Sequence, residues 1–220
     1  MSIHLNRELD KLKRRILFLG SKVEENLNAS LEALKEKNSR MAELIEDKDF
    51  EIDELEIEIE EECLKILALH QPVAVDLRFI VSVLKINNDL ERIGDLAVKI
   101  AKRAKRIVSF QAIADIYPID EMAAEVIKML RNSLDALINH DSGLAASVLA
   151  ADNKVDSFNK DIVQRSKQQY ADKSFDIETF VGVIDVSRGF ERIADHTTNI
   201  AEDIIYMVEG KIVRHGRADT

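Results

Sequence analysis

The 220-residue chain carries one pattern of residues twice, and this repeat restricts the fold more than any other feature. The segment that begins at Val23 aligns with the segment that begins at Val126, at an offset of 103 residues. The pairs that match at this offset include Leu27 and Leu130, Ser30 and Ser133, Leu31 and Leu134, and Leu34 and Leu137. Farther along, the offset becomes 100, as for Ile100 and Ile200. A three-residue difference in one turn explains the change, so the chain contains two copies of one folding unit.

Helical periodicity runs through both copies. Apolar residues recur every three or four positions in six segments, roughly residues 5–37, 40–70, 73–109, 119–140, 142–170 and 175–210. Residues 51–60 alternate apolar and acidic residues, as an exposed strand would. The helical spacing nevertheless continues through and beyond this stretch, at Ile52, Leu55, Ile59, Ile66 and Leu69. We therefore predict an all-α fold without strands.

The two prolines mark the main divisions of the chain. Pro72 lies between the second and third helical segments. Pro118 opens the second copy, in keeping with the preference for proline in the first turn of a helix. We predict two tandem three-helix bundles that pack side by side, residues 1–110 and 118–212, followed by a tail of residues 213–220.

Composition restricts the class of protein. The formal net charge of −10 argues against a nucleic-acid binder, which needs a basic face. No apolar run approaches the roughly 18 residues of a membrane span, and the first residues lack the apolar core of a signal peptide. The single cysteine, Cys63, is typical of a reducing compartment, and its apolar surroundings favour a buried core thiol. We expect a cytoplasmic helical protein.

Each copy contains two pairs of acidic residues that lie one helical turn apart. They are Asp49 and Asp53 with Glu91 and Asp95 in the first copy, and Asp152 and Asp156 with Glu191 and Asp195 in the second. Facing residues of an antiparallel hairpin have a constant sum of residue numbers, which is 144 for the first set and 347 for the second. These sums centre the hairpins on Pro72 and on the polar link at Lys173 and Ser174. Each hairpin, with axes about 8–10 Å apart, therefore brings four carboxylates to one level.

Four converging carboxylates raise each other's pKa values, and a multivalent cation would remove the repulsion. Oxygen ligands suit Mg²⁺, Mn²⁺, Ca²⁺ or iron, and do not suit a structural zinc site of Cys and His. Asn199, one turn past Asp195, could add an oxygen ligand or anchor a water, whereas His196 is expected to flank the site. The sequence predicts a metal site in each hairpin.

Two alternatives stay open for these acids. Acidic pairs on a helix are common on solvated faces, and Arg92 and Arg192 follow the two glutamates and could pair with carboxylates. In the first copy Lys99 stands where the second copy has Asn199, which gives Asp95 a partner that needs no metal. A metal-dependent enzyme is the other alternative. Against it, no histidine follows a glutamate at Glu-x-x-His spacing, and no residue reads as a nucleophile beside the acids.

The residues that carry these pairs resemble a known family, the PhoU regulators of bacteria and archaea. The stretch "ERIADHTTNIAE" from Glu191 is close to the family's signature, and "ERIGDLAVKIA" from Glu91 is a looser copy. "HQPVAVDLRFI" from His70 is similar to the junction between the family's second and third helices. The resemblance covers essentially the whole chain, and the family's acidic motif falls on the same eight carboxylates. Leu96 and Lys99 depart from the second copy's His196 and Asn199.

The resemblance implies two tandem three-helix bundles and a non-enzymatic function. It implies an adaptor between a phosphate ABC transporter and a membrane sensor histidine kinase, which restrains uptake and represses phosphate-starvation genes when phosphate is plentiful. It also implies metal at the acidic motifs, with iron foremost and Mn, Mg, Ca or Zn as alternatives. A homodimer is a further expectation, and a helical scaffold with merely solvated acids remains the plainest alternative.

Overall fold

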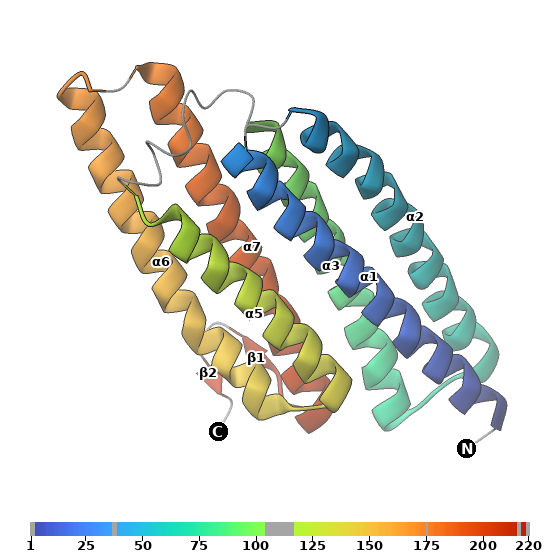
Figure 1. Ribbon diagram of the computed structural model, residues 1–220. Coiled ribbons are helices and arrows are strands. Elements are labelled where there is room, and N and C mark those ends of the chain that lie inside the picture. Colours follow the sequence, from blue (N-terminus) through green and yellow to red (C-terminus); the bar gives the residue numbers. More distant parts are fainter. Residues whose placement is uncertain (1–2, 37–38, 104–116, 175, 215–216, 219–220) are drawn as a thin grey trace.

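The protein is built from long antiparallel helices, shown as a ribbon in Figure 1. The structure, a computed structural model, describes residues 3–36, 39–103, 117–174, 176–214 and 217–218. Over these residues the helices are α1 (Ile3–Glu36), α2 (Ser39–His70), α3 (Ala74–Arg103), α5 (Ile119–Asn139), α6 (Ser142–Ala171) and α7 (Ile177–Glu209). Their bounds differ from the predicted segments by only a few residues, except that residues 104–109 of the third segment lie outside the described residues.

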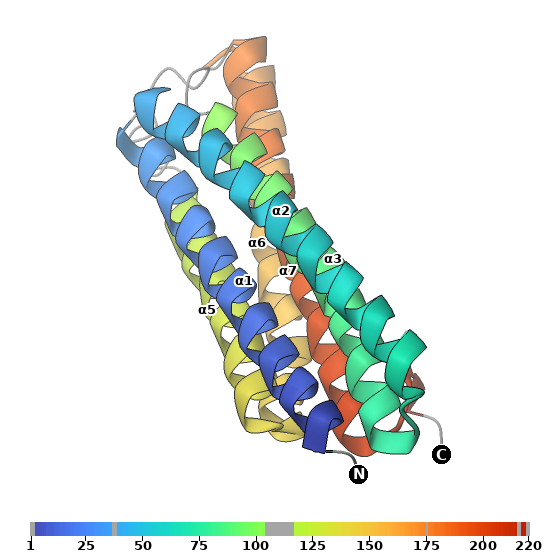
Figure 2. The same cartoon turned by 90° about the vertical axis from the view of Figure 1, so that its right-hand side faces the viewer.

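The helices form two bundles, as the repeat predicts. Helices α1, α2 and α3 pack against one another, and so do α5, α6 and α7. The bundles meet through α3 against α7 and α1 against α5, and Figure 2 shows α1 beside α5. Each contact joins a helix to its own counterpart in the other copy, so the two repeats are related by a pseudo-two-fold arrangement. The predicted all-α fold of two tandem three-helix bundles is confirmed.

One apolar core runs through both repeats. A single cluster of buried side chains extends from Leu12 and Ile16 in α1 to Ile200 and Ile204 in α7. Cys63 is fully buried in this cluster, and burial raises the pKa of its thiol to about 12, which confirms the prediction of a core thiol. Because the core is shared, the second bundle completes the burial of the first.

Local signals fix the ends of the helices. Asp141 precedes α6 and accepts a hydrogen bond from the backbone N–H of Leu144 at 2.9 Å, and Asp176 precedes α7 and accepts one from Thr179 at 2.8 Å. Gly210 ends α7 with φ at 74°, a left-handed conformation that glycine adopts without strain. These caps set the length of the helices that carry the second acidic set.

The prediction of no strands is wrong for the last residues. Strand β1 (Val213–Arg214) pairs antiparallel with β2 (Arg217–Ala218), in a short hairpin after α7. Two-residue strands are too short to produce a recognisable alternation of apolar and polar residues, which explains why the sequence did not reveal them. None of the described helices is long and apolar enough to cross a membrane.

Candidate functional site

The four acids of the first repeat lie together on α2 and α3, as the hairpin register predicts. Burial, and after it the nearby charges of Asp53, Asp95 and Glu91, together raise the pKa of Asp49 to about 6. Burial also raises the pKa of Asp53, with a contribution from Asp95. Burial raises the pKa of Glu91, Arg92 opposes the change, and Asp95 and Asp53 reinforce it. The carboxylates are therefore close enough to repel one another.

A glycine makes room for this set. A side chain at Gly94 on α3 would place its Cβ 2.9 Å from Oδ1 of Asp49, so only glycine lets Asp49 approach the helix without displacement. The same Oδ1 is buried and has no hydrogen-bond partner among the residues that the structure describes. A buried oxygen without a donor is unfavourable, and a bound cation would supply the missing partner. The chemistry of this one oxygen therefore fits a cation ligand.

The four acids of the second repeat form an equivalent set on α6 and α7. Burial raises the pKa of Asp152, and Asp156 and Asp195 add to the effect. Burial raises the pKa of Glu191 as well, followed by the charges of Asp195, Asp156 and Asp152. The pKa of Asp195 is raised by burial and by Asp156, and lowered by His196 and Arg192. Each of the two bundles thus contains one acidic set, at equivalent positions of the internal repeat.

The two sets differ in the cations that accompany them. In the first, Nζ of Lys99 lies 3.0 Å from Oδ2 of Asp95, and Arg92 lies 3.3 Å from Oε2 of Glu91 and 3.8 Å from Oδ2 of Asp95. The alternative in which Lys99 and Arg92 pair with these acids is therefore observed, whereas the described residues show no ion pair of Arg192 with the second set. In the second, Lys160 lies 3.8 Å from Asp156. Among the described residues, no three His, Cys, Asp or Glu side chains are placed to hold one ion, so metal binding stays a prediction at both sets.

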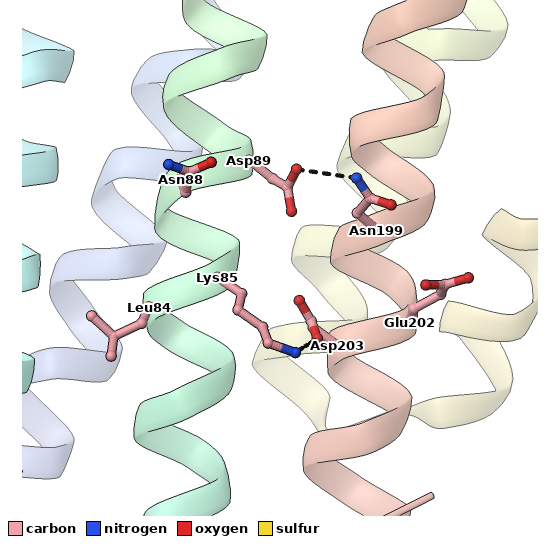
Figure 3. A pocket seen from close by; sticks show the side chains of 7 residues that line it. All are labelled: Leu84, Lys85, Asn88, Asp89, Asn199, Glu202 and Asp203. Carbon is pink, nitrogen blue, oxygen red and sulfur yellow. Dashed lines mark hydrogen bonds and ion pairs between the residues drawn. The ribbon is translucent and has the colours of Figure 1, made fainter. Parts of the chain in front are cut away.

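His196 and Asn199 turn toward the other repeat. Nδ1 of His196 lies 2.8 Å from Oδ1 of Asp89 on α3, and Nδ2 of Asn199 donates to the same oxygen at 3.3 Å. Figure 3 shows Asn199 and Asp89 facing each other between α7 and α3. Sequence reasoning did not single out Asp89, because its counterpart in the second copy is Gly189 and hairpin register says nothing about contacts between repeats.

A polar groove follows this boundary between the repeats. It encloses about 560 Å³ and is lined by Leu84, Lys85, Asn88, Asp89, Asn199, Glu202 and Asp203 (Figure 3). Nζ of Lys85 lies 2.7 Å from Oδ1 of the buried Asp203, and Oγ of Ser82 donates to the Asp203 carbonyl at 3.1 Å. Farther along the same boundary, Nη2 of Arg103 lies 2.6 Å from Oδ2 of Asp185. Opposite charges therefore join the two repeats at two places.

Comparison with known proteins places the chain among relatives of the same architecture. The family model for the PhoU domain matches residues 16–104 and 119–204, one match in each repeat. The phosphate-specific transport system accessory protein PhoU homolog of Pseudomonas putida is 37% identical over 216 residues, which is 98% of this chain and 84% of the relative.

Solved structures agree with the sequence comparison. The crystal structure of PhoU from Pseudomonas aeruginosa superposes with a TM-score of 0.85 at 36% identity, covering 93% of this chain and 99% of that one. The phosphate transport system regulatory protein PhoU from Streptococcus pneumoniae gives a TM-score of 0.87 at 30% identity, covering 95% and 99%. Sequence and fold therefore agree along nearly the whole chain, which belongs to the PhoU family.

Proposed function

We propose that this chain regulates phosphate transport as a non-enzymatic adaptor that joins a phosphate ABC transporter to a sensor histidine kinase. The observation that carries the proposal is the match along 98% of the chain to a relative named as an accessory protein of a phosphate-specific transport system. A structural neighbour named as a phosphate transport regulatory protein supports the same role. Long exposed helical faces suit contact with other proteins, and the adaptor acts by docking.

Metal is the second part of the proposal. Asp49, Asp53, Glu91 and Asp95 would hold ions in the first repeat, and their counterparts Asp152, Asp156, Glu191 and Asp195 would do so in the second. Support comes from the mutual repulsion of these carboxylates and from the unpartnered Oδ1 of Asp49. Iron is the first candidate metal, with Mn, Mg, Ca and Zn as alternatives. A bound ion would neutralise the carboxylates and connect the two helices of each hairpin.

Metal content tests this part directly. The chain is purified without chelator or affinity metal, and bound metals are measured by mass spectrometry. The matched variant carries Asp152→Ala, Asp156→Ala, Glu191→Ala and Asp195→Ala. We expect stoichiometric metal in the wild type and a reduced content in the variant. If no metal is bound after reloading with iron or manganese, the acids are solvated surface residues and not metal ligands. The adaptor proposal would be unaffected by that result.

A binding titration tests the adaptor. The transporter's cytoplasmic subunits and the kinase's cytoplasmic domain are titrated against metal-stripped and metal-loaded protein. We expect binding to both partners, and a difference between the two preparations would assign the metal to docking. Equal affinity would remove metal from the docking mechanism. Absence of binding to either partner would contradict the adaptor, and phosphoester turnover lost in Glu191→Ala would favour an enzyme instead.

A further inference from the structure

Helix α2 has a second apolar face in addition to the one that it buries. Ile45, Ile52, Ile59 and Ile66 are buried against the bundle, where α2 packs on α1 and α3. Three large apolar side chains point away from that contact and form what we call the α2 stripe: Phe50, Ile57 and Leu64, with exposures of 63%, 54% and 53%. Figure 1 shows α2 at one outer edge of the molecule.

The stripe runs nearly straight along the helix. Its members are seven residues apart, so each is rotated by only about 20° from the last and lies about 10 Å farther along the axis. The three side chains therefore form a line about 20 Å long. Isolated exposed apolar residues are normal on a protein surface, but heptad spacing is the pattern by which one helix packs along another.

Acidic residues border the stripe on both sides. On the helical wheel Glu54 and Glu61 lie next to it on one side, and Glu60 lies next to it on the other. All three side chains are exposed. The charge on both borders has one sign, which restricts what can cover the apolar line.

The second repeat shows that the fold does not require this face. At the offset of 103 residues, the stripe positions correspond to Asn153, Lys160 and Lys167 on α6, and all three are exposed. The buried face is retained at the same offset, since Ile59 corresponds to Ile162 and both are fully buried. Two helices with the same role in the bundle thus differ on their outer faces, and only α2 combines apolar with acidic residues there.

We propose that the α2 stripe is a docking site for an amphipathic helix with basic borders on a partner protein, an inference that rests on the proposed adaptor function. Leucine-like side chains at heptad spacing would cover Phe50, Ile57 and Leu64, and flanking Lys or Arg would meet the acidic borders. A second copy that presents its own α2 would bring acidic borders together, and an anionic lipid surface would repel them. Charge complementarity therefore selects a basic protein segment.

A synthetic peptide supplies the probe. A fluorescent 21-residue helix with Leu at the core heptad positions and Lys at the flanking ones is titrated by anisotropy, beside a copy with Glu in place of Lys. The stripe variant carries Phe50→Ser, Ile57→Ser and Leu64→Ser. The control variant carries Phe18→Ser, Val75→Ser and Ile177→Ser, which are also exposed by half or more and leave the charge unchanged. Circular dichroism verifies that both variants keep their helices.

We expect the Lys peptide to bind the wild type and to lose affinity as salt rises. The stripe variant should weaken binding by roughly tenfold or more, and the control variant by less than about twofold. Equal binding to the stripe variant, no binding to the wild type, or equal binding of the Glu peptide would overturn the proposal. Sedimentation of the chain alone provides a further test, because self-association that the stripe variant abolishes would assign the face to a second copy.

The two proposals can be distinguished in the titration with transporter subunits and kinase domain. If a partner binds the wild type and the stripe variant equally, the adaptor stands and the α2 stripe is not its docking site. If no partner binds the wild type, the proposed adaptor function is contradicted, whether or not the peptide binds. A partner that binds the wild type and the control variant but loses affinity for the stripe variant supports both.

Discussion

At Asp49, burial and three neighbouring carboxylates act in the same direction and raise the pKa from 3.8 to about 6. The folded state therefore holds this proton more tightly than the unfolded state. Protonated Asp49 therefore contributes to the free energy of unfolding. This contribution is complete below pH 3.8, declines as the pH rises, and is lost above pH 6. In metal-free protein near neutral pH the charged Asp49 is a source of instability, which a bound cation would relieve.

The substitution Asp49→Asn removes this charge. We expect metal-free Asn variant to be more stable than metal-free wild type at pH 7 by about 1 kcal/mol, a value reduced for the solvent exposure of the carboxyl. The advantage should disappear as the pH falls below 4. Urea unfolding in chelator at pH 4, 5, 6 and 7 measures it. Parallel pH dependences of the two proteins would contradict the assigned cause.

At Lys85, one side chain neutralises a buried carboxylate across the boundary between the repeats. The substitution Lys85→Met should lower the free energy of unfolding by about 1–3 kcal/mol, because Asp203 stays buried and loses a charged partner. Lys102→Met is the matched control. Lys102 lies the same 2.7 Å from Glu46, but both side chains are about half exposed, so the loss should be under about 0.5 kcal/mol. Equal losses in urea unfolding would argue against the role of burial.

Residue contacts were predictable from the sequence only where the chain itself fixes the register. A short turn at Pro72 makes α2 and α3 antiparallel neighbours, so the register places Asp49 near Asp95, and the structure agrees. No such rule relates α3 to α7, whose contact depends on how the whole bundles pack. The pairs Asp89 with His196 and Lys85 with Asp203 therefore required the structure.

At the scale of the element, hydrophobic spacing predicted the helices well and their outer faces less completely. The buried positions of α2 keep helical spacing, which decided against a strand at residues 51–60. The same stretch looks alternating because Ile57 belongs to a second, exposed face. A pattern of apolar residues shows which positions are apolar, but it does not show which of two faces the bundle covers.

The start of α6 gives a prediction at this scale. Asp141 accepts the hydrogen bond of a backbone N–H in the first turn, so Asp141→Ala should lower the free energy of unfolding by about 1 kcal/mol. Asp135→Ala, an exposed site inside α5, serves as the control and should change it by less than about 0.5 kcal/mol. Thermal melts followed by circular dichroism compare the two. A larger loss for Asp135→Ala would show that the cap does not anchor this helix.

At the scale of the whole molecule, the shared core couples the two repeats. Leu27 in α1 and Leu130 in α5 are repeat counterparts and belong to one continuous cluster of buried residues. Neither bundle can therefore open without exposing apolar surface of the other. This coupling predicts that the repeats unfold together, although each resembles a separate three-helix unit.

Two single substitutions test this coupling. Leu27→Ala and Leu130→Ala should each cost about 2–5 kcal/mol and should each move one common unfolding transition to lower urea concentration. Near-ultraviolet and far-ultraviolet circular dichroism should report the same midpoint. Two separate transitions, with only the mutated repeat shifted, would show that the bundles are independent domains.

The two ion pairs at the boundary between repeats occupy equivalent positions with the charges reversed. Lys85 faces Asp203, and the counterparts of these residues, Asp185 and Arg103, face each other. If two first repeats met through the same surface, Lys85 would face Arg103. If two second repeats met, Asp185 would face Asp203. Like repeats from two chains therefore repel each other at this surface and unlike repeats attract, a discrimination that disfavours a first repeat meeting another first repeat, or a second meeting another second.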